Sequence, residues 1–238
     1  MNSTRLPGKM LLPLAGAPLL QRVIERVQRA TKLDDLVLAV PSKDAADFAP
    51  ICNGRAWLYA YPGDESDLVG RYLRAALAHD ADLIVRVPCD NPCIEGKYID
   101  EAVEQYLDEC HTFYSNTTVG ISQPDKFRIL YVDGLGCEVL SVSRLKWLDR
   151  KTHGHPRLRE HPHGWFYEQR NKWESEGDCG ITINSLEPES TMSQLRLDVN
   201  MPADYDFIAD IYAALWPSNN NFTITDILAY LETKKATA

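Results

Sequence analysis

The feature that most constrains the fold is a regular alternation of short apolar runs with amphipathic stretches in the first half of the chain. The apolar runs have the length of buried strands and lie at 36–40, 57–61 and 83–87. Apolar residues recur at helical spacing around them, which predicts helices at 18–30, 44–51, 67–79 and 98–110. A strand that is apolar on both faces needs helices on both sides of its sheet. The pattern therefore predicts a doubly wound, mostly parallel sheet.

Beyond residue 112, the alternation of apolar runs and amphipathic stretches becomes less regular. Strands are predicted at 112–116, 137–142 and 195–200, and helices at 143–150, 203–215 and 225–233. Neither an internal repeat nor a low-complexity linker interrupts the 238 residues, a length that suits one large α/β domain. We predict a single domain over 1–238, in which residues 112–200 form a segment that faces the substrate.

Composition narrows the classes of partner. The net charge of −9 argues against a nucleic-acid surface, which needs a basic face. The sequence has no apolar stretch of membrane-spanning length and no charged-then-apolar leader, so we expect a cytoplasmic protein without a membrane partner. The six cysteines include no CxxC pair, so we expect reduced thiols rather than disulfides or a zinc site.

A short loop near the start of the chain combines two cations with a glycine. Arg5 and Lys9 flank Gly8, and Ser3 and Thr4 precede them. Two cations, backbone N–H groups and a glycine that permits close approach suit a polyphosphate, above all ahead of a helix. The same composition is also typical of a solvated turn. The residues alone leave both interpretations open.

An acidic residue follows the last of the three buried runs. Asp90 comes shortly after the strand predicted at 83–87. In doubly wound sheets, ligands bind beyond the carboxyl ends of the strands. A carboxylate at that place is a candidate ligand for Mg²⁺, which prefers oxygen ligands. The alternative is an aspartate that caps the turn after the strand.

Seven short motifs occur in a fixed order along the chain. They lie at 3–9, 67–71, 86–92, 133–135, 138, 159–161 and 199–204. This order resembles that of the sugar cytidylyltransferases, above all the spore-coat polysaccharide biosynthesis proteins related to acylneuraminate and 3-deoxy-manno-octulosonate cytidylyltransferases. The resemblance covers essentially the whole chain. It implies a Rossmann-like nucleotide-diphospho-sugar transferase fold, which is a three-layer α/β/α sandwich with a mixed sheet. It also implies transfer of CMP from CTP to a sugar, with release of pyrophosphate, for surface polysaccharide or glycoconjugate synthesis.

The resemblance also implies roles for individual residues. The nucleotide would be bound by Ser3, Thr4, Arg5, Gly8, Lys9, Asp67, Arg71 and Arg86. The sugar would be bound by Asp133, Glu138, Arg159 and His161. Arg5, Lys9 and Asp90 would be catalytic, with Mg²⁺ held by Asp90, Asn200 and Asp198. Alternatives stay open: Asp67 and Arg71 have the spacing of an ordinary helical ion pair, and Arg86 can equally pair with a carboxylate.

The chain departs from the family pattern at three places. Asn200 stands where the family has a second metal-binding aspartate, and an amide is a poorer ligand than a carboxylate. Asp198 shares its strand face and is a candidate substitute. Gly136 stands where an aspartate is common. The family's first strand and the arginine after it have no counterpart before Ser3, so we expect the usual first strand to be lacking and the given sequence to start late.

Two rival functions follow from these departures and from the fold. One is a glycosyltransferase of the same fold, although no Asp-x-Asp motif follows a predicted strand. The other is a catalytically impaired protein that binds a nucleotide or a sugar. The partners expected from the leading interpretation are CTP and a sugar, and a homodimer is a further expectation from the resemblance.

Overall fold

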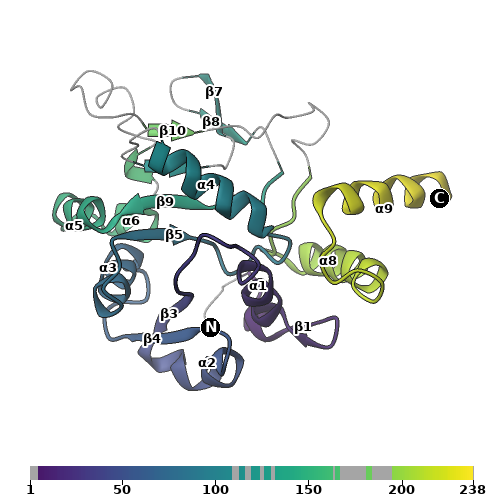
Figure 1. Cartoon of the computed structure of the whole chain (residues 1–238), viewed down its shortest axis with the longest axis horizontal. Coiled ribbons are helices and arrows are strands. Elements are labelled where there is room, and N and C mark those ends of the chain that lie inside the picture. Colours follow the sequence, from purple (N-terminus) through teal and green to yellow (C-terminus); the bar gives the residue numbers. More distant parts are fainter. Residues whose placement is uncertain are drawn as a thin grey trace.

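The computed structural model describes most of the chain (Figure 1). The described residues are 5–108, 113–115, 119–123, 126–129, 132–162, 164–166, 181–183 and 195–237. Ser3 and Thr4, both predicted to bind the nucleotide, lie outside them. Among the described residues, no helix combines the length and the apolar character that crossing a membrane requires. In the described part of the chain, Cys52, Cys89, Cys93 and Cys137 form no disulfide.

The strands form a mixed arrangement. The two-stranded parallel sheet consists of β3 (Val37–Pro41) and β4 (Trp57–Tyr61). A four-stranded sheet has the order β10 (Ile181–Ile183), β6 (Phe113–Ser115), β9 (Glu138–Ser141) and β5 (Leu83–Arg86). Because β9 runs antiparallel to both β5 and β6, the mixed sheet is confirmed and the mostly parallel sheet is wrong. Of the described strands, none joins β3 to β5, so the sheet is in two pieces.

Two short hairpins complete the described strands. They are β1 (Pro13–Leu14) with β2 (Ala17–Pro18), and β7 (Val119–Gln123) with β8 (Lys126–Ile129). The strand predicted at 195–200 is wrong, because it reduces to one bridge between Arg196 and Asp133. The cause is that its alternate N–H groups serve two different loops. Leu197 donates to the carbonyl of Asp133, and Val199 donates to that of Asp90.

The helices lie close to their predicted positions. The first half contains η1 (Lys9–Leu11), α1 (Leu19–Val27), η2 (Ser42–Asp44), α2 (Ala45–Cys52), α3 (Leu68–Ala78) and α4 (Gly96–Asp108). The second half contains α5 (Val142–Lys151), α6 (Pro156–Glu160), α8 (Pro202–Leu215) and α9 (Ile224–Thr237). Proline occupies the first turn of α8, where its missing N–H costs nothing.

Helices cover both faces of the larger sheet. On one face, Val85 of β5 and Val139 of β9 pack in a core with α1, α4 and α8. On the other face, Ile84 and Leu140 pack with α3 and α5. Figure 1 shows α4 crossing β9, in keeping with their direct contacts. Neighbouring residues of one strand thus enter different cores, as successive side chains must, and the three-layer α/β/α sandwich is confirmed.

Candidate functional site

The loop near the start of the chain contacts the acidic residue after β5. Lys9 is only 9% exposed, and its ammonium donates to Oδ2 of Asp90 at 2.7 Å and to the carbonyl of Val199 at 2.6 Å. Gly8 precedes it with φ at 69°, a left-handed conformation that glycine adopts without strain. The predicted cation and the predicted carboxylate are therefore brought together, although they lie 81 residues apart.

The helix expected to follow this loop does not follow it directly. The loop leads into η1, which has three residues, and the β1–β2 hairpin comes before α1. The N–H of Leu19, the first residue of α1, donates to the carbonyl of Leu12. The first N–H of α1 is thus bonded within the chain. An anion held here would depend on Arg5, on Lys9 and on the open backbone at Gly8.

A third segment closes the site from the C-terminal half. The N–H of Val199 donates to the carbonyl of Asp90 at 2.9 Å, which places Asn200 beside the loop. Arg5 donates to Oδ1 of Asn200 at 3.2 Å. Arg5, Lys9, Asp90 and Asn200 therefore meet, as the resemblance implied.

The other acidic residues of this region pair with an arginine that the sequence reasoning missed. Arg196 holds both oxygens of Asp198, at 3.1 and 2.8 Å, and lies 3.4 Å from Asp133. Asn200 donates its amide N–H to Asp198. Burial raises the pKa of Asp133, and the charges of Asp198 and Asp90 raise it further. Asp133 thus lies beside Asp198 and Asp90, two of the residues expected to bind the metal.

Arg196 could have been found from the sequence, because residues two apart on an extended chain share a face and this places Arg196 beside Asp198.

The donor set fits a metal ion shared with substrate. Within the described parts of the chain, no group of three His, Cys, Asp or Glu side chains is arranged to hold a metal. Mg²⁺ needs fewer protein ligands, since it is commonly held by one or two carboxylates together with substrate phosphates and water. The Asp90 side chain is 26% exposed. Asn200, whose side-chain oxygen accepts from Arg5, directly follows Val199, which bonds to the backbone of Asp90. These two oxygen donors suit such a shared ion.

Two further predicted residues pair with each other. Arg86 and Glu138 face each other across β5 and β9, and their charged groups lie 2.9 Å apart. The Nε of Arg86 also donates to the hydroxyl of Tyr72. Burial acts to lower the pKa of Arg86, but the charge of Glu138 and the contact with Tyr72 together outweigh it, and the pKa is raised. The alternative that Arg86 pairs with a carboxylate is the arrangement observed.

Arg71 approaches the Asp90 loop from α3. It donates to the carbonyl of Glu65, and its charge acts on the Cys89 thiol together with those of Arg86 and Lys9. Burial, aided by Asp90, raises the pKa of Cys89 to about 11 despite these cations. Because only the thiolate is a strong nucleophile, this cysteine is unsuited to covalent catalysis at neutral pH.

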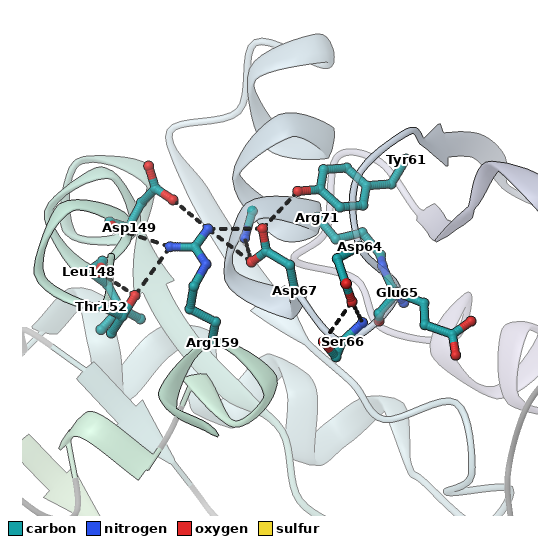
Figure 2. Close-up of polar contacts among 11 residues, drawn as sticks. Tyr61, Asp64, Glu65, Ser66, Asp67, Arg71, Leu148, Asp149, Thr152 and Arg159 are labelled. Carbon is teal, nitrogen blue, oxygen red and sulfur yellow. Dashed lines mark hydrogen bonds and ion pairs between the residues drawn. The ribbon is translucent and has the colours of Figure 1, made fainter. Parts of the chain in front are cut away.

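Asp67 and Arg159 also contact each other (Figure 2). Asp67 caps the N-terminus of α3 by accepting the N–H of Gly70 at 2.9 Å, and it accepts the hydroxyl of Tyr61 at 2.8 Å. Arg159 lies 2.9 Å from Asp67 and 2.8 Å from Asp149. Burial would raise the pKa of Asp67, but hydrogen bonds from Arg159, Gly70 and Tyr61 hold it below its ordinary value. His161, at the end of α6, is exposed.

Replacing Gly70 with alanine is expected to destabilise the protein, although alanine favours a helix. A Cβ at this position would overlap the Tyr61 hydroxyl and the Asp67 carboxylate. We expect the free energy of unfolding to fall by about 1–3 kcal/mol, as in other overpacked sites, measured by urea unfolding. Arg74→Ala, on the exposed side of the same helix, is the control and should have little effect. A stabilised Gly70→Ala variant would contradict the close packing at Tyr61.

Comparison with known proteins gives one consistent result. A family model described as cytidylyltransferase matches residues 1–223. The spore coat polysaccharide biosynthesis protein SpsF of Bacillus subtilis is 26% identical over 220 residues, which cover 89% of this chain and 82% of that protein. A 3-deoxy-manno-octulosonate cytidylyltransferase of Trichlorobacter lovleyi is 35% identical over 106 residues, covering 44% of this chain and 41% of that protein. A solved cytidylyltransferase structure from Leptospira borgpetersenii has a TM-score of 0.81 at 23% identity, covers 99% of this chain and 92% of that one, and shares the fold.

Proposed function

The chain belongs to the cytidylyltransferase family, and from this premise we propose that it transfers CMP from CTP to a sugar, with release of pyrophosphate. The observation that carries the proposal is the junction of Lys9, Asp90 and Val199, beside the contact between Arg5 and Asn200. Two cations and a half-buried carboxylate meet at this junction, and such a set of charges suits a nucleoside triphosphate with its metal ion. The named relatives, a spore coat polysaccharide biosynthesis protein and a 3-deoxy-manno-octulosonate cytidylyltransferase, support a sugar as the acceptor.

In the proposed reaction, a sugar hydroxyl attacks the α-phosphorus of CTP. The bond from that phosphorus to the bridging oxygen breaks, pyrophosphate carries away the electron pair, and the hydroxyl proton is released to water. The protein contributes by positioning the reactants and by stabilising the leaving group. Lys9 suits this role, because Asp90 and the Val199 carbonyl fix its ammonium before substrate binds. Arg5 and Arg71 would supply further positive charge to the triphosphate.

Asp90 and Asn200 are the residues that would hold Mg²⁺ together with the phosphates. When bound, the ion would neutralise charge on the triphosphate. Asp198 has both oxygens engaged by Arg196, so we propose that it orients the Asn200 amide. Because CTP is an intracellular substrate, we propose a cytoplasmic location.

The deciding experiment is pyrophosphate release from CTP and Mg²⁺ by the purified chain with a panel of acidic and neutral sugars. The proposal expects release that requires CTP, the metal and one class of sugar. CTP binding without release with any sugar would overturn it in favour of an impaired binding protein, for which Asn200 is the motivating residue. Transfer of a sugar from a nucleotide sugar to an acceptor would overturn it in favour of a glycosyltransferase.

A further inference from the structure

A second polar cluster links β4 and α3 to α5 and α6. It consists of Tyr61, Asp67, Asp149, Thr152 and Arg159, which we call the Asp67 clamp. Tyr61 ends β4, Asp67 begins α3, Asp149 and Thr152 lie at the end of α5, and Arg159 lies on α6. Figure 2 shows Arg159 between Asp67 and the α5 residues, with Tyr61 approaching Asp67 from the opposite side. The clamp thus connects α6 to two longer helices.

Both terminal nitrogens of Arg159 are bonded within the clamp. Its Nη2 bonds to both Asp67 and Asp149, and its Nη1 bonds to the Asp149 carbonyl at 3.1 Å and to the Thr152 hydroxyl at 3.4 Å. Its side chain is 17% exposed, and that of Asp67 is 20% exposed. A guanidinium that bonds through both terminal nitrogens has little capacity left for a substrate. Asp67 is similarly occupied by Tyr61, Gly70 and Arg159.

Two glycines beside the clamp leave room for the Tyr61 side chain. A Cβ at Gly63 would overlap the Tyr61 ring, and a Cβ at Gly70 would overlap both the Tyr61 hydroxyl and Asp67. Glycine at both positions lets Tyr61 lie between the turn before α3 and the helix itself. The clamp is therefore part of the packing of this region and is more than a chance contact between surface charges.

We infer that Asp67 and Arg159 are positioning residues that bind each other instead of substrate, and that they hold α6 and the adjoining His161 in place on the sugar side of the site. This inference rests on the proposed function. The resemblance had assigned Asp67 to the nucleotide and Arg159 to the sugar. In the structure, Asp67 instead lies at the N-cap of α3 and binds Arg159 of α6. The longer helix α3 thus fixes the position of the short helix α6. A five-residue helix has little stability of its own, so its position depends on such contacts.

Asp67→Asn tests the ion pair of the clamp without removing the N-cap of α3. Asparagine is as good an N-cap as aspartate, so α3 and Arg71 should stay in place, while the ion pair with Arg159 is lost. Arg159→Gln removes the other partner. In hydrogen exchange on the full chain, each variant should speed the exchange of peptides covering Pro156–Glu160 by about tenfold or more. The double variant should exchange no faster than the faster single one, because the two residues act through one contact.

Arg157→Gln, on the same helix and exposed, is the matched control and should leave exchange unchanged. Fast exchange in Arg159→Gln alone, or additive effects in the double variant, would overturn the inference. Hydrogen exchange needs no enzymatic turnover. It therefore still tests the inference if the wild-type protein releases no pyrophosphate and the proposed function fails.

Steady-state kinetics distinguish a positioning role of Asp67 and Arg159 from direct contact with substrate. With the sugar found in the screen, Asp67→Asn and Arg159→Gln should raise the KM for sugar by similar factors and leave the dissociation constant of CTP unchanged. Arg159→Lys should fall between wild type and Arg159→Gln, because one ammonium cannot bridge both carboxylates. A weakened CTP affinity in Asp67→Asn would make Asp67 a nucleotide ligand. A raised KM in Arg159→Gln alone would make Arg159 a sugar ligand. Either outcome would overturn the inference.

Discussion

Replacing Lys9 with methionine is expected to lower kcat/KM for CMP transfer by about 100-fold or more, the usual cost of losing one preorganised charge at a transition state. Lys9 is nearly buried, and Asp90 and the Val199 carbonyl fix its ammonium. A cation held in this way loses little freedom when the triphosphate binds, so most of its attraction is available to the leaving pyrophosphate. Methionine keeps the length of the apolar stem and removes the charge. The measurement is pyrophosphate release at varied CTP concentration.

The control for this variant is Lys32→Met. Lys32 is also a lysine paired with a carboxylate, Glu104, at 2.8 Å, but it is exposed. Its replacement should leave kcat/KM unchanged. Circular dichroism and the urea midpoint should confirm that the Lys9 variant is folded. A folded variant with wild-type kcat/KM would show that Lys9 joins the loop to Asp90 without acting on the triphosphate.

The sequence predicted those strands and helices whose apolar residues recur at a regular spacing. The runs that became β3 and β4 are apolar throughout, and the run that became β5 is apolar except for Arg86. Helix α3 begins one residue after its capping Asp67. The β1–β2 hairpin was missed because its strands have two residues each, too few to show a period. Charged residues of an amphipathic helix mostly face solvent. Arg26 is nevertheless 1% exposed, because its guanidinium donates to the carbonyls of Cys93, Ile94 and Phe222.

Likewise, only some contacts of the candidate site could be predicted from the sequence. The contact between Lys9 and Asp90 could be expected, since each residue carries a local signal and both lie where a doubly wound sheet binds ligands. The pairs Asp67 with Arg159 and Arg86 with Glu138 could not, because no local signal marks Arg159 or Glu138 as the partner across 92 and 52 residues. Each of these four residues resembles a substrate ligand when considered singly. Only the tertiary structure shows that their charges neutralise each other.

Replacing Glu138 with glutamine is expected to lower the free energy of unfolding by about 2–4 kcal/mol, because it leaves the Arg86 cation inside the sheet without a counter-charge. The side chains of Arg86 and Glu138 are 16% and 8% exposed. Glu104→Gln is the matched control: its pair with Lys32 is as short but exposed, so the urea midpoint should not move. Replacing Arg86 with methionine and Glu138 with leucine together should recover part of the loss, since no charge then stays buried alone. Equal stability of the Glu138 and Glu104 variants would mean that water reaches the Arg86 pair. Arg86 would then be accessible to a phosphate, and its assignment to the nucleotide would regain support.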